Sequence, residues 1–175
     1  ENKKSASKIK EILGISEYHF LGLKEEIIDT TLLDVIVPLE SLISKLKPDV
    51  VFTHHGGDLN QDHRVVFDAT SIATRPISAH VVKQVFTYET ISSTEQPPNL
   101  PHNSFNPNYF VDITNVLSNK IEAMKCYDGE LLVFPHPRSE EGIEVTAKKR
   151  GIESGFNAAE AFTLIRSLVS EVNQS

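Results

Sequence analysis

Apolar residues recur along the chain at two spacings, one typical of helices and the other of strands. Residues 5–13 form a charged segment whose apolar side chains share one side, which predicts a helix that ends at Gly14. A second helix is expected to begin with Asp34 as its N-cap and to hold Pro38 in its first turn. Short apolar runs lie between such segments, and this alternation predicts an α/β fold with a mainly parallel sheet.

The short apolar runs predict the strands of that sheet. Residues 50–53 are typical of a buried parallel strand, and a polar loop and then a helix from about His63 to Thr74 follow them. Residues 161–165 fit a helix and a strand equally well, because periodicity does not distinguish the two over so short a run. The other predicted strands cover residues 18–23, 81–91 and 109–113.

Composition and charge narrow the class of protein. The chain has 175 residues, enough for one domain, and 39% of them are hydrophobic, as in folded globular proteins. The net charge of −7 gives no electrostatic reason to bind nucleic acid, and no apolar run is long enough to span a bilayer. We expect a cytoplasmic protein whose single cysteine, Cys126, forms no internal disulfide. The proline-rich loop at residues 92–107 is expected to serve the functional site or a contact within a homo-oligomer.

The densest group of chemically active side chains is the run from His54 to Arg64. It holds three histidines, two carboxylates and side-chain amides within eleven residues. It directly follows the strand predicted at residues 50–53, and ligands of open α/β sheets bind at the carboxyl ends of the strands. Imidazole and carboxylate groups together suit zinc.

Other interpretations of this run are open. Asp58, Asn60 and Asp62 have the spacing that begins an EF-hand calcium loop, although His63 and Ala69 stand where that loop needs Gly and Glu. The run also fits a polar loop whose Asp62 caps the next helix, or a phosphate site at that helix, where the carboxylates would repel the anion. A nucleotide-binding domain is the weakest hypothesis, because the chain lacks the glycine-rich signatures of such domains.

The stretch from Pro48 to Arg64 resembles the second motif of the LmbE/PIG-L family, zinc-dependent deacetylases of N-acetylglucosamine-type substrates. Other segments resemble further parts of that family in the same order along the chain. The resemblance implies a Rossmann-like LmbE fold, with residues 1–175 as a single deacetylase domain. The additional segments are residues 20–23, 105–114, 136–139, 150–151 and 159–162.

The resemblance also implies a zinc site in which His63 matches the histidine that binds the metal. The family's other two protein ligands and its general base lie in an N-terminal His-Pro-Asp-Asp motif. The only His-Pro pair here is His136-Pro137, which Arg and Ser follow. We therefore expect an N-terminally incomplete domain that lacks a strand–helix unit, because a catalytic zinc ion usually has about three protein ligands.

The other residues of the run have less specific expected roles. His55, Asp58 and Asn60 are expected to contact the substrate or to support the site. Asp62, which we group with the catalytic residues, is expected to orient the neighbouring histidine or to cap its helix. Strand alternation turns His54 away from His55, so we interpret His54 as structural.

A late loop adds two candidates. His136 lies between two prolines and resembles a late active-site histidine of the family, which would polarise the acetyl carbonyl or stabilise its oxyanion. Arg138 is expected to bind a sugar hydroxyl or a phosphate. An ordinary surface loop explains both residues equally well.

The function implied by the resemblance is hydrolysis of the acetamide of an N-acetylated sugar or sugar conjugate by a zinc enzyme, with release of acetate. The sugar is expected on a glycolipid, another conjugate or a nucleotide. The alternative is a non-catalytic sugar-binding or assembly domain with a degraded metal site. A His-Pro-Asp-Asp motif upstream of Glu1 would favour the enzyme, and its absence would favour the alternative.

Overall fold

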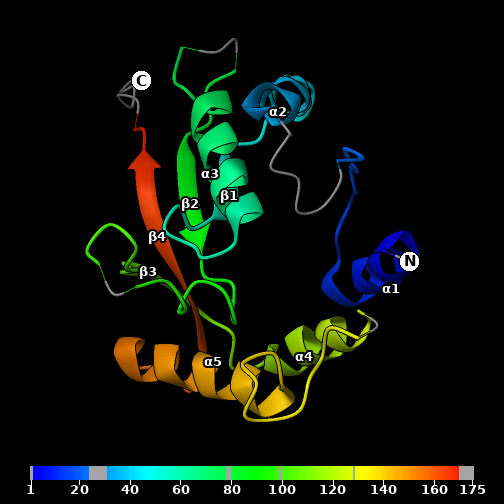
Figure 1. The fold of residues 1–175 in the computed structure, drawn as a ribbon, viewed down its shortest axis with the longest axis vertical. Helices are drawn as coiled ribbons and strands as arrows, with labels where there is room; N and C mark the ends of the chain where they lie inside the picture. The colour runs from blue at the N-terminus through cyan, green and yellow to red at the C-terminus, as the bar shows by residue number, and fades with distance from the viewer. Residues whose placement is uncertain (1, 24–30, 78–79, 99, 128, 170–175) are drawn as a thin grey trace, which may run out of the picture. The chain divides into compact units, whose positions relative to one another are not determined.

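The computed structural model describes residues 2–23, 31–77, 80–98, 100–127 and 129–169. Five α-helices and four β-strands lie within these ranges (Figure 1). The chain divides into two compact units, the first made of Glu1–Phe20 and Phe110–Ala161 and the second of Leu21–Tyr109 and Phe162–Ser175. The elements are α1 (Asn2–Leu13), α2 (Leu32–Leu46), β1 (Val50–His54), α3 (Gln61–Ala73), β2 (Gln84–Tyr88), β3 (Tyr109–Asp112), α4 (Leu117–Lys125), α5 (Glu140–Ser154) and β4 (Ala159–Ser167).

The four strands form one sheet in the order β1-β2-β4-β3. β1 runs parallel to β2, whereas β2 and β4 are antiparallel. β3 is also antiparallel to β4, because Asn108 donates its N–H to Phe162 O and Ile113 donates its N–H to Ala158 O. The α/β class is therefore confirmed, but the expected strand direction is corrected, since only the β1–β2 pair is parallel.

In the second unit, α3 packs on β1, and α2 packs on α3 (Figure 1). The hydroxyl of Thr53 donates to that of Thr70 at 3.2 Å, which pairs two buried polar groups between β1 and α3. Val50 and Phe52 point to the other face of β1 and are 39% and 50% exposed, so the prediction of a fully buried strand is wrong. The core consists of two clusters, Ile43, Ala73, Val82 and Val85 in one and Val35, Ile36 and Ala69 in the other.

α2 begins earlier than the sequence predicts. Thr31 is its N-cap, and the carboxylate of Asp34 accepts the Thr31 N–H at 3.1 Å and the Thr31 hydroxyl at 3.0 Å, as in a capping box. Asp34 is thus the third helical residue rather than the cap. Pro38 consequently lies inside the helix, beyond its first turn, where it cannot donate a backbone hydrogen bond.

In the first unit, α4 packs on both α1 and α5. Ser139 caps α5 by accepting the N–H of Gly142 at 2.9 Å. A buried apolar cluster of this unit consists of Ile113, Ala147 and Ala158. α1 confirms the predicted first helix and extends it to Asn2.

Two further expectations about strands are settled by the structure. Residues 18–23 are not a strand, and the side chains of Phe20 and Leu23 are 52% and 43% exposed. The ambiguous segment at residues 161–165 is part of β4. Pairing with β2 decides its conformation, which local periodicity does not specify.

Candidate functional site

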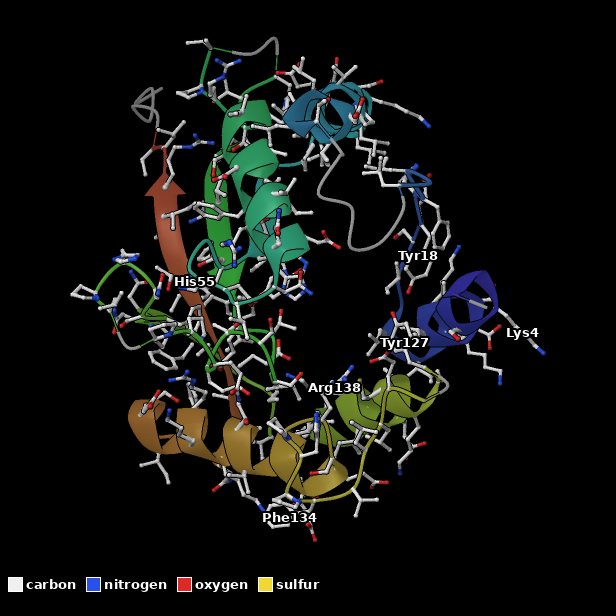
Figure 2. The ribbon with its side chains drawn as sticks, viewed as in Figure 1. Lys4, Tyr18, His55, Tyr127, Phe134 and Arg138 are labelled. Atoms are coloured by element: carbon white, nitrogen blue, oxygen red, sulfur yellow. The ribbon has the colours of Figure 1, made fainter. Side chains whose placement is uncertain are left out.

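The polar run lies where β1 ends and α3 begins, and Figure 2 labels His55 at this point. Asn60 is the N-cap of α3, and its Oδ1 accepts the N–H groups of Asp62 at 2.8 Å and His63 at 3.4 Å. The expectation that Asp62 caps this helix is therefore wrong. Arg64 donates from Nη1 to the carbonyl oxygens of Asp58 and Leu59, each at 2.7 Å, which ties the loop to the first turn of the helix.

Asp58 is the most enclosed residue of the run, with 1% of its surface exposed. Its Oδ1 accepts the Ser93 hydroxyl and the Asn60 N–H, the latter at 2.9 Å. Its Oδ2 accepts the Thr94 hydroxyl at 2.6 Å. Burial alone would raise the pKa of the Asp58 carboxyl, but these hydrogen bonds, with the nearby His63, outweigh burial and hold the pKa below its usual value. Asp58 is therefore a buried carboxylate that stays ionised.

His63 lies in the first turn of α3 and faces Asp58. Its Nδ1 is 3.2 Å from Asp58 Oδ1, with 19% of the histidine side chain and none of the aspartate side chain exposed. The two atoms are close enough for an ion pair but are not aligned as a hydrogen bond, so Nδ1 is a buried nitrogen without a hydrogen-bond acceptor in the described part of the chain. The carboxylate behind Nδ1 leaves Nε2 as the ring nitrogen that could hold a ligand.

His54, which sequence alternation assigns a structural role, borders this site. Its ring stacks on that of His63 with centroids 3.9 Å apart and an interplanar angle of 6°. Its Nε2 lies 3.2 Å from the Tyr88 hydroxyl, and its Nδ1 lies 3.3 Å from the Thr90 hydroxyl. Burial, then the adjacent His63, lowers the pKa of His54 to about 4, so this ring is neutral at pH 7. Burial, then Asp58, raises the pKa of Tyr88 to about 12, which keeps its hydroxyl protonated.

Lowering the pH from about 6.5 to about 4 is expected to destabilise the metal-free protein through His54. Its pKa is about 4 in the folded state against a usual 6.5, so in this interval the unfolded chain binds a proton that the folded chain does not. The contribution of His54 to the free energy of unfolding is complete above pH 6.5. It is lost as the pH falls, and the loss is about 2 kcal/mol after allowance for partial exposure of the ring. Denaturant unfolding with a chelator present measures this slope. His54→Gln does not titrate and should have a flatter profile; equal slopes in both proteins would contradict the prediction.

His55 and the glycines after it join the site loop to the loop at residues 92–107. His55 Nε2 lies 3.0 Å from Asn103 O, and its ring meets that of Phe105 edge-on at 5.3 Å. Gly57 lies so close to Asn103 that a Cβ there would be 2.5 Å from the Asn103 Cα. His55 is therefore held against the neighbouring loop, and its expected contact with substrate stays a prediction.

His136 and Arg138 lie in the first unit, in the loop between α4 and α5. The Arg138 N–H donates to His136 Nδ1 at 3.1 Å, so the proton of a neutral His136 ring lies on Nε2. The Arg138 guanidinium pairs with Glu130. Figure 2 labels Arg138 in this loop, and it also labels Phe134 and Tyr127 of the same unit. The proposed roles of His136 and Arg138 toward a sugar stay predictions.

Sequence reasoning did not assign four residues to this site: His54, Tyr88, Ser93 and Thr94. Ser93 and Thr94 follow Asp58 by 35 and 36 residues. The available signal was the long irregular loop at residues 92–107, which the sequence predicts to serve the functional site or a subunit contact, without indicating which of its residues matter.

The described residues do not form a complete metal site. They include no group of three or more His, Cys, Asp or Glu side chains placed to hold one ion. The Asp58 oxygens are occupied by hydroxyl groups, and both His54 nitrogens have partners. His63 is the residue of the run that fits as a zinc ligand, and one ligand does not suffice.

The sequence comparison identifies the family to which this arrangement is similar. The profile described as PIG-L: GlcNAc-PI de-N-acetylase matches residues 2–74. The resemblance to the LmbE/PIG-L family is thereby confirmed over that part of the chain, which includes the whole polar run. The resemblances at residues 105–114, 136–139, 150–151 and 159–162 lie outside the match and stay predictions. No curated protein matches the sequence closely enough to count as a relative.

Three solved structures share the fold. GalB, the 4-carboxy-2-hydroxymuconate hydratase from Pseudomonas putida, has a TM-score of 0.73 at 20% identity, over 97% of this chain and 73% of its own. A conserved protein from Thermus thermophilus has a TM-score of 0.72 at 21% identity, over 99% of this chain and 76% of its own. The N,N'-diacetylchitobiose deacetylase from Pyrococcus horikoshii has a TM-score of 0.72 at 18% identity, over 94% of this chain and 62% of its own.

These similarities establish the fold and leave the reaction open. A hydratase and a deacetylase both have this fold, so the chemistry depends on the site rather than on the architecture. The chain spans less than two thirds of the deacetylase.

Among the described helices, none combines the length and the apolar character needed to cross a bilayer.

Proposed function

We propose that the protein is a zinc-dependent deacetylase that hydrolyses the acetamide of an N-acetylated sugar or sugar conjugate. The observation that supports this most is the loop between β1 and α3, which lies within the PIG-L match and presents His63 beside the buried carboxylate of Asp58. A carboxylate behind an imidazole is the arrangement that orients metal-binding histidines in zinc enzymes. The deacetylase from Pyrococcus horikoshii, which has the same fold, is consistent with the proposal.

Zinc, when bound, would supply Lewis acidity and a water of lowered pKa. His63 would be one of its ligands, and the remaining donors would have to come from outside the residues described. A single imidazole ligand does not define any reaction step at the metal. The chain's own contribution is to hold His63 in place and to keep the adjacent His54 neutral, so that no positive charge opposes a cation there.

Roles for other residues complete the proposal. Asp62, in the first turn of α3, would assist proton transfer or orient the site. Asn60 is already engaged through Oδ1 as the cap of α3, so only its amide NH₂ would remain to bind a sugar hydroxyl. His136 and Arg138 would contact the acetyl group and the sugar, as the family resemblance implies.

Acetate release tests the proposed activity. The full-length protein, supplied with Zn²⁺, should liberate equal amounts of acetate and free amine from at least one of four substrates: N-acetylglucosamine, its phosphatidylinositol conjugate, diacetylchitobiose and UDP-N-acetylglucosamine. The corresponding sugars without an acetyl group serve as controls. Release of acetate from none of them by zinc-loaded protein would overturn the proposal. Saturable binding without turnover would favour the non-catalytic sugar-binding alternative.

A further inference from the structure

Asp58 is the acidic neighbour of His63 on the buried side of its ring, among the residues that the structure describes. The Nδ1 of His63 lies 3.2 Å from Asp58 Oδ1, within ion-pair distance although not aligned as a hydrogen bond, and in the described part of the chain no hydrogen-bond partner engages this nitrogen. A carboxylate that accepts hydrogen bonds from several donors stays ionised and cannot itself donate a proton. An ionised carboxylate beside Nδ1 favours a proton on that nitrogen, which leaves the lone pair on Nε2.

Asp58 is held so that it cannot turn away from His63. Ser93 donates to one carboxylate oxygen and Thr94 to the other, the latter at 2.6 Å. Thr94 Oγ1 also accepts the N–H of Thr90 at 2.7 Å, which fixes the position of its hydroxyl. The main chain joins the same two loops, since Leu59 donates its N–H to Ser93 O at 3.3 Å. The carboxylate is therefore fixed by a loop about 35 residues further along the chain.

The plane of the His63 ring is fixed separately. His54 stacks on it almost in parallel, and Tyr88 and Thr90 hold the His54 ring in turn. Rotation of His63 out of this plane would break the stack. Within the described ranges, no hydrogen bond engages His63 Nε2, so this nitrogen is the one left to bind a ligand.

We propose that Asp58, held by Ser93 and Thr94, is a positioning residue that fixes His63 with its proton on Nδ1 and its lone pair on Nε2. The identity of the ligand at Nε2 rests on the proposed function, whereas the inference about the tautomer does not. The chain thus builds one preoriented nitrogen donor at the carboxyl end of β1, with its support supplied by the loop at residues 92–107.

Nuclear magnetic resonance of ¹⁵N-histidine-labelled, metal-free protein at neutral pH tests the tautomer. The wild type is expected to show an unprotonated Nε2 at His63. Thr94→Val removes one hydroxyl that holds Asp58, and Asp58→Asn removes the charge, so both should shift His63 towards a mixture of tautomers. Thr94→Ser retains the hydroxyl and should behave as the wild type. Asp68→Asn removes an equal charge from the exposed side of α3 and should have no effect.

Zinc affinity of the full-length protein is the second measurement. Thr94→Val and Asp58→Asn should weaken Zn²⁺ binding by about 10- to 100-fold, as loss of a partner behind a metal-bound histidine does. Thr94→Ser and Asp68→Asn should bind as the wild type does. If the wild type binds no zinc, the proposed function fails. The resonance measurement of the His63 tautomer then decides this inference alone. A proton on Nε2 in the wild type, or unchanged tautomer and zinc affinity in both Thr94→Val and Asp58→Asn, would overturn it.

Discussion

Replacing Gly57 by alanine is expected to destabilise the protein by about 3 kcal/mol, near the upper end of the usual cost of overpacking. The new Cβ would lie 2.5 Å from the Asn103 Cα and 2.7 Å from Asn103 O. Backbone atoms cannot rotate aside, so one of the two loops must move. Movement of Asn103 would also stretch the 3.0 Å contact between its carbonyl oxygen and His55 Nε2.

Gly56→Ala is the matched control for this prediction. Its Cβ would lie 2.6 Å from ring atoms of Phe67, a side chain that can turn, so we expect a cost of only about 1 kcal/mol. Denaturant unfolding of the two variants beside the wild type measures both costs. Equal effects, or a larger effect at Gly56, would show that the close approach of the two loops is not as the structure describes it.

The sequence predicted the elements that local pattern determines. The periodic apolar residues of α1 located that helix to within a few residues, and β1 followed by a polar loop and α3 was found in the correct order. His63 and Asp58 were both named from the same run, because they are five residues apart in one motif. Such features depend on short-range spacing, which a single sequence contains.

Features that depend on distant partners could not be predicted in the same way. Nothing near Asp58 indicates that its oxygens pair with Ser93 and Thr94, because loop closure over 35 residues leaves no periodic trace. The position of His54 beside His63 was not predicted for a related reason, while its structural role stays a prediction. Alternation describes which side of a strand a residue faces, but His54 is the last residue of β1, and its neighbour is decided by where α3 begins.

Two errors about secondary structure have different physical causes. Residues 18–23 are apolar enough for a strand, but a strand needs a hydrogen-bonded partner, and β-propensity alone does not supply one. The N-cap of α2 was placed at Asp34 because aspartate is a good cap. The spacing of Thr31 and Asp34 already contained the capping-box pattern, which puts the acidic residue at the third helical position.

His63→Ala is expected to abolish stoichiometric zinc binding by the full-length protein and to lower deacetylase activity by at least about 10³-fold, equal to about 4 kcal/mol of transition-state stabilisation. The reason is that one of about three protein ligands is lost, and neighbouring groups cannot replace it. Asp58 is fully engaged by hydroxyl groups, and His54 has partners on both nitrogens. Metal analysis after dialysis and the acetate assay measure the two effects.

The same substitution should cost little stability, which separates loss of a ligand from loss of the fold. His63 is not part of either apolar cluster of the second unit, and 19% of its side chain is exposed. We expect the free energy of unfolding of the metal-free protein to change by about 1 kcal/mol, as for a partly exposed side chain with one stacking contact. His102→Ala, at an exposed histidine outside the polar run, is the control and should retain both zinc and activity. If His63→Ala retained its zinc and its activity, the metal would lie elsewhere, and the observation on which the deacetylase proposal depends would be lost.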